Sequence, residues 1–134
     1  MSAGEAAIWH DVECGAYAVD LPLWEELAEA AGGPVLDLGC GTGRVALHLA
    51  RRGHEVTGVD REPELAAELN RRAAGLPARA LRGDARDFEL DERAFALALA
   101  PMQLVQLLDG AIERAALLER LAAHLRPGGT AALA

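Results

Sequence analysis

Hydrophobic and polar positions follow two alternating periodicities along the chain. Short apolar runs bounded by glycine or proline predict buried strands, and apolar residues three and four positions apart predict helices that cover a sheet. The expected strands are residues 35–38, 55–59, 78–81, 95–100 and 130–134. The expected helices are residues 21–31, 43–53, 63–74 and 110–125. Strands that alternate with helices predict right-handed βαβ units, and therefore a doubly wound α/β fold with a parallel sheet.

Turn residues mark where these elements begin and end. Asp20 precedes the first helix and Asp109 precedes the last, and both are expected to cap the helices that follow them. Gly32 and Gly33 end the first helix. The run Pro127-Gly128-Gly129 is expected to end the last helix and to place the start of the fifth strand at Thr130.

The most informative segment is the loop after the first strand, Asp37-Leu38-Gly39-Cys40-Gly41-Thr42-Gly43. An open α/β sheet binds its ligand at such a strand-to-helix loop. Glycines without side chains let a ligand approach the backbone, and the N–H groups at the start of the next helix favour an anion. A tight turn without a ligand would need only one or two glycines. Three at alternate positions after an acid favour a binding loop, and Cys40 within it is expected to be a small core filler.

The spacing of the glycines argues against a dinucleotide site, because the third glycine of G-x-G-x-x-G would stand at Arg44. The pattern acid-x-G-x-G-x-G instead resembles motif I of the class I S-adenosylmethionine-dependent methyltransferases. Three further segments resemble that family in the same order, namely Val56-Thr57-Gly58-Val59-Asp60, Gly83-Asp84-Ala85 and Leu125-Arg126-Pro127-Gly128-Gly129. The resemblance implies a single domain over residues 1–134, with an N-terminal helical segment (1–33) and a Rossmann-like core (34–134) ordered 3-2-1-4-5.

The resemblance also implies a donor-binding role for individual residues. Asp37 would pair with the amino group of S-adenosyl-L-methionine, and the N–H groups around Gly39, Gly41 and Gly43 would receive its carboxylate. Asp60, at the end of the second strand, would accept both ribose hydroxyls.

The other cofactor-binding candidates are expected near the adenine and the methionine end. Asp84 would accept a hydrogen bond from the exocyclic amine of adenine, and the N–H of Ala85 would donate to a ring nitrogen. Arg61 would lie against the adenine edge, or be a plain surface arginine. Ala100 would contact the methionine end through its backbone, and Tyr17 would either contact it or simply pack.

Composition narrows the remaining possibilities. The 134 residues carry a formal net charge of −8, so a nucleic-acid partner is not expected. All thirteen basic residues are arginine, which removes lysine as a catalytic base. Two cysteines, Cys14 and Cys40, form neither a disulfide framework nor a metal spacing, and the N-terminus lacks the basic start of a signal peptide. No apolar run is long enough for a membrane span. These features predict a cytoplasmic protein without a bound metal.

The catalytic residues are left unassigned, because methyl transfer from an activated sulfonium depends mainly on alignment of donor and acceptor. Ala100-Pro101-Met102-Gln103 lacks the acid or Asn followed by Pro-Pro and an aromatic residue, the pattern of family members that methylate exocyclic amines of bases or glutamine. A small-molecule acceptor is therefore expected, with Met102 or Gln103 lining its site. The alternatives are a non-catalytic module that binds S-adenosylmethionine or S-adenosylhomocysteine, an inactive methyltransferase fragment, a dehydrogenase-type nucleotide enzyme and an aminopropyltransferase.

The sequence ends at Ala134, within the expected fifth strand. In the resembled fold this strand is followed by a helix and by strands six and seven. The expectation is therefore a sheet truncated after strand five, belonging either to the N-terminal part of a longer methyltransferase or to a chain that covers this strand by self-association. The strand carries no charge or proline after Pro127 that would oppose edge pairing.

Overall fold

Five parallel strands form a single sheet in the order β3-β2-β1-β4-β5. The structure is a computed structural model and describes residues 3–11, 18–101 and 108–134. The strands are β1 (Val35–Leu38), β2 (Val56–Asp60), β3 (Ala78–Arg82), β4 (Phe95–Ala100) and β5 (Leu125–Leu133). The predicted fold class and strand order are therefore confirmed.

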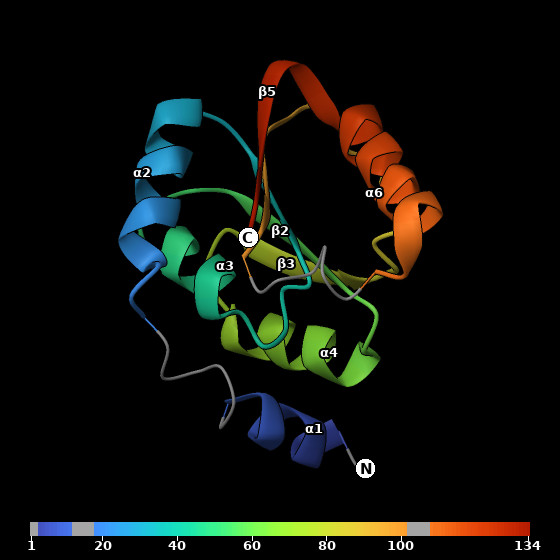
Figure 1. Cartoon of the computed structure of the whole chain (residues 1–134). Helices are drawn as coiled ribbons and strands as arrows, with labels where there is room; N and C mark the ends of the chain where they lie inside the picture. Colours follow the sequence, from blue (N-terminus) through green and yellow to red (C-terminus); the bar gives the residue numbers. More distant parts are fainter. Residues whose placement is uncertain (1–2, 12–17, 102–107) are drawn as a thin grey trace.

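Helices cover both faces of this sheet (Figure 1). The described helices are α1 (Ala3–His10), which packs on α4 and not on the sheet, α2 (Leu21–Ala31), α3 (Arg44–Ala50), α4 (Pro63–Arg72) and α6 (Gly110–His124). One apolar cluster joins α2, α3 and α4 to one face, and a second joins α6 and the segment around Phe88 to the other. Because both faces are covered, β1 and β4 are buried along their whole length and read as continuous apolar runs, apart from Asp37.

The start of β5 differs from the prediction. Helix α6 ends at His124 and β5 begins directly at Leu125, so the Pro-Gly-Gly run lies inside the strand and not before it. Leu125 pairs with Phe95 and Thr130 with Leu97, so residues 126–129 bulge opposite Ala96 alone. A bulge tolerates a proline without an N–H and a glycine such as Gly128, whose φ is 81°. Regular pairing begins at Thr130, the predicted start.

Neither expected helix cap is made by its side chain. The carboxylate of Asp20 accepts hydrogen bonds from the Arg44 guanidinium at 2.6 and 2.8 Å and from Nε1 of Trp24 at 2.7 Å, so it has no cap bond to α2. Asp109 also makes no side-chain cap bond; its own N–H donates to the carboxylate of Glu113. At Asp20 a charged partner replaces the cap bond that residue type alone suggests.

The N-terminal segment contains a defined helix, α1, which packs against α4. Asp11, just after α1, accepts hydrogen bonds from the guanidinium of Arg72 at 2.7 and 3.2 Å. It also accepts one from the Thr42 hydroxyl at 2.9 Å. These contacts hold the segment beside the glycine loop. No helix in the described part of the chain is long and apolar enough to cross a membrane.

Candidate functional site

The predicted binding residues gather at the carboxyl edge of the sheet. Gly39 follows β1, Asp60 ends β2, Asp84 lies just beyond β3 and Ala100 ends β4. The chain runs from β1 outward to β3 and then returns to β4, so the order reverses between β1 and β4. Open α/β sheets form their ligand crevice at that reversal, outside the carboxyl ends of the strands.

The three loop glycines adopt conformations that other residues rarely take. The φ angles of Gly39, Gly41 and Gly43 are 70°, 56° and 105°. A Cβ on Gly43 would also lie 2.8 Å from the Leu47 side chain on α3 and 3.0 Å from the Leu69 side chain on α4, so these side chains would have to shift. The third glycine is therefore favoured by helix packing, and the loop it ends turns sharply from β1 into α3.

Cys40 lies inside the core, as expected for a small filler. Its side chain packs against the backbone of Gly58 on β2, where a Cβ would lie 2.7 Å from Sγ of Cys40. Burial raises the pKa of the Cys40 thiol, so it stays protonated. The absence of a side chain at Gly58 thus lets the glycine loop lie close against β2.

Asp37 is the least satisfied polar group in the site. Its side chain is 1% exposed, and neither carboxylate oxygen has a hydrogen-bond partner among the residues that the structure describes. Burial raises the pKa of Asp37 to about 7, although the charge of Arg44 opposes this; Asp60 adds a smaller increase. A buried carboxylate without a partner is costly, and a cationic ligand group placed against it would relieve that cost.

Asp60 joins the end of β2 to the glycine loop. Its Oδ2 accepts a hydrogen bond from the Gly41 N–H at 2.9 Å, and its Oδ1 accepts one from the Glu62 N–H at 2.9 Å. An ionised carboxylate has about four acceptor positions, so two remain for a ligand. The diol expected at this residue matches that remaining capacity.

Asp84 has a partner that the sequence analysis did not anticipate. The Arg86 guanidinium donates to its Oδ1 from Nε at 2.9 Å and to its Oδ2 at 2.7 Å. These hydrogen bonds hold the pKa of Asp84 at about 2. The backbone N–H of Arg86 donates to Oδ1 as well, at 2.9 Å. An acid followed two residues later by arginine is the available sequence signal, but it is common on protein surfaces.

The remaining candidates occupy less defined positions. The Arg61 side chain is 76% exposed, with Nε 3.9 Å from Glu62, and its charge helps to lower the pKa of Asp84. Ala85 packs partly into the α6-side cluster. Ala100 is fully buried, and its carbonyl accepts a hydrogen bond from the Ala134 N–H at 3.0 Å. Tyr17, Met102, Gln103 and Cys14 lie outside the described residues.

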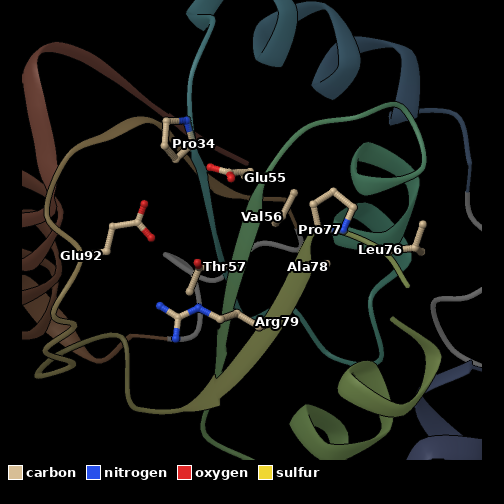
Figure 2. Close-up of a pocket in the computed structure, with 9 residues that line it drawn as sticks. All are labelled: Pro34, Glu55, Val56, Thr57, Leu76, Pro77, Ala78, Arg79 and Glu92. Atoms are coloured by element: carbon tan, nitrogen blue, oxygen red, sulfur yellow. The ribbon is translucent and has the colours of Figure 1, made fainter. Parts of the chain in front are cut away.

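A hollow of about 330 Å³ lies at the opposite edge of the sheet (Figure 2). Pro34, Glu55 and Pro77 line it, and each directly precedes a strand, so the hollow is at the amino edge and apart from the glycine loop. Residues 3–11, 18–101 and 108–134 hold no group of three or more His, Cys, Asp or Glu side chains that could bind a metal ion.

Comparisons with known proteins agree with this arrangement. A family model described as a methyltransferase domain matches residues 35–129, from the start of β1 into β5. The chain is 36% identical over 102 residues to the cypemycin N-terminal methyltransferase of a Streptomyces species, covering 76% of this chain and 41% of that protein.

Two solved structures share the fold. The CcbJ methyltransferase from Streptomyces caelestis is 30% identical with a TM-score of 0.77, covering 87% of this chain and 49% of that one. CalS10, an S-adenosylmethionine-bound amino pentose methyltransferase from Micromonospora echinaspora, is 28% identical with a TM-score of 0.79, covering 94% and 55%. The chain thus spans about half the length of the proteins it matches. On its sheet order, its glycine loop and these matches, the chain belongs to the class I methyltransferase-domain family.

Proposed function

We propose that this chain provides the donor-binding half of an S-adenosylmethionine-dependent methyltransferase that acts on a small-molecule acceptor. The observation that carries the proposal is the buried carboxylate of Asp37 beside the glycine loop, which has no hydrogen-bond partner in the described part of the chain. The primary ammonium of S-adenosylmethionine is both cationic and a hydrogen-bond donor, so it would satisfy the charge and the acceptor positions of a buried carboxylate together. The N–H groups of Gly39 and Gly43 donate within the chain to the carbonyls of Val59 and Cys40, and that of Gly41 donates to Asp60. The loop's proposed contribution is therefore close approach of the methionine end to a backbone without side chains.

Each residue has a binding role in this proposal. Asp37 holds the ammonium, Gly39, Gly41 and Gly43 let the methionine end approach the backbone, and Asp60 accepts the ribose hydroxyls. Asp84 and the N–H of Ala85 bind the adenine edge, with Arg61 beside it and the backbone of Ala100 near the methionine end. When bound, S-adenosylmethionine supplies a methyl group already activated on a sulfonium. The chain therefore mainly has to orient donor and acceptor, and no catalytic base is assigned.

The acceptor is proposed to be small. The net charge of −8 disfavours nucleic acid, whose binding requires a basic surface. Two similar proteins are a cypemycin N-terminal methyltransferase and an amino pentose methyltransferase, so small molecules that carry an amino group are the first acceptors to assay. A cytoplasmic location also remains part of the proposal.

Titration calorimetry with S-adenosylmethionine, S-adenosylhomocysteine and NAD tests the donor assignment. We expect saturable heat with both adenosyl compounds and none with NAD. Saturable heat with NAD alone would overturn the proposal. If both adenosyl compounds bind but no methyl is transferred to any amine acceptor, the non-catalytic binding module becomes the better description of this chain.

A further inference from the structure

The guanidinium of Arg86 connects two segments that flank the predicted adenine position. Its Nε and one terminal nitrogen face the Asp84 carboxylate, at 2.9 and 2.7 Å. Its other terminal nitrogen lies 2.5 Å from Oε1 of Glu113, in the first turn of α6. Arg86 therefore ties the segment after β3 to the first turn of α6.

The hydrogen bonds of Asp84 leave it little freedom. An ionised carboxylate has about four acceptor positions. Oδ1 uses two of them, for Nε and for the backbone N–H of Arg86, and Oδ2 uses one for the terminal nitrogen. One position is left, on Oδ2, so the acid can accept a single further hydrogen bond from one direction.

Glu113 keeps the arginine in this orientation. Its Oε1 receives the Arg86 guanidinium, and its Oε2 receives the backbone N–H of Asp109. The Glu113 carboxylate is therefore fixed by the start of α6, and the planar guanidinium between two carboxylates has one geometry that satisfies both. A lysine at this position could balance the negative charge of the two carboxylates, but its ammonium could not reproduce the planar arrangement of donors that a guanidinium offers to both.

We propose that Arg86 is a positioning residue for purine selection: it orients Asp84 so that the single free acceptor position of Oδ2 faces a 6-amino group and rejects a 6-oxo group. The inference rests on the proposed function, because it requires Asp84 to lie at the adenine edge. Arg86 itself does not touch the ligand in this account. It acts by fixing the acceptor, and a misaligned acceptor weakens binding of the 6-amino ligand more than binding of the 6-oxo ligand.

The experiment measures the dissociation constants of two ligands for the whole chain by titration calorimetry. S-adenosylhomocysteine carries a 6-amino group, and S-inosylhomocysteine carries a 6-oxo group in its place. The variants are Arg86→Ala and Arg86→Lys. Arg93→Ala is the matched control, because it removes an arginine that pairs with Glu89 and makes no hydrogen bond to Asp84.

For Arg86→Ala we expect the preference for the amino ligand to fall about tenfold, mainly through weaker S-adenosylhomocysteine binding. Arg86→Lys should lose most of the preference as well, and Arg93→Ala should keep it. A general structural defect would weaken both ligands equally and leave their ratio unchanged, and that result would overturn the inference. Tighter S-adenosylhomocysteine binding by Arg86→Ala would also overturn it, because Arg86 would then compete with the purine. Failure of the unmodified chain to bind either compound would instead refute the proposed function.

Discussion

The backbone N–H of Gly41 donates a 2.9 Å hydrogen bond to Oδ2 of Asp60, across 19 positions of sequence. This bond connects the centre of the glycine loop to the end of β2. The conformation of the loop and the orientation of the predicted ribose-binding carboxylate are therefore mutually dependent, and a change at either residue should affect both.

Asp60→Ala should weaken S-adenosylhomocysteine binding by about 1.5–3 kcal/mol, because charge-assisted contacts to the ribose diol are lost. Asp60→Asn is the matched variant, since its amide oxygen can still accept the Gly41 N–H while the charge is gone. It should weaken binding less than Asp60→Ala does. Calorimetry measures both constants, and unchanged affinity in folded Asp60→Ala would place the ribose elsewhere.

Asp37 should make the ligand-free protein less stable as pH rises. Its pKa is about 7 in the folded state and near 3.8 when unfolded, so the folded state binds more protons between these values. The favourable contribution of Asp37 to the free energy of unfolding is therefore fully present below about pH 4, and it is lost as pH rises through about 7. In Asp37→Asn the free energy of unfolding should change less with pH than in the unmodified chain, as measured by urea unfolding between pH 5 and 8. An unchanged profile would mean that Asp37 has a partner in solution.

The same titration predicts the pH dependence of donor binding. If an ionised Asp37 receives the ligand ammonium, S-adenosylhomocysteine affinity should rise from pH 6 to pH 8. Asp37→Asn should bind weakly at every pH in this range. Calorimetry in buffers matched for ionic strength checks this, and affinity that falls over the interval would argue against an ammonium at Asp37.

His124 is a fully buried structural residue that sequence spacing did not single out. The Leu90 N–H donates to its Nε2 at 3.0 Å, and its Nδ1 lies 2.6 Å from the Arg120 carbonyl, so the neutral ring carries its proton on Nδ1. The His124 and Phe88 rings are 4.6 Å apart. His124→Phe keeps a ring but leaves the Leu90 N–H unpaired, and should lower the free energy of unfolding by about 1–3 kcal/mol. Urea unfolding measures the loss, with His54→Phe as the control.

Self-association through β5 is a further prediction. In the described sheet β5 has β4 on one side only. The Ala134 N–H donates to the Ala100 carbonyl on β4. The backbone N–H groups of a strand point alternately to its two neighbours, and Ala131 is an odd number of positions from Ala134. The Ala131 N–H therefore points away from β4. Ala131→Pro should therefore prevent edge pairing, whereas Ala131→Thr keeps the N–H and should not. Light scattering over a concentration series compares them, and a monomeric unmodified chain at all concentrations would contradict the prediction.

The sequence by itself determined the fold class, because apolar periodicity and glycine position report local backbone geometry and burial. The run 35–38, the loop at Gly39, Gly41 and Gly43, and the acid at Asp60 identify the first βαβ unit and its binding edge without any long-range information. The strand order followed from the family resemblance alone.

Tertiary structure decided which partner each charged side chain takes. Asp20 binds Arg44 instead of capping α2, and Asp84 is held by Arg86, which in turn reaches Glu113 on α6. Tertiary structure also made residues 126–129 a bulge inside β5, because pairing with β4 continues on both sides of them. Residue type tells which side chains can form such bonds. Only the folded chain fixes which of several acceptors is close enough, because that choice depends on distances between segments far apart in sequence.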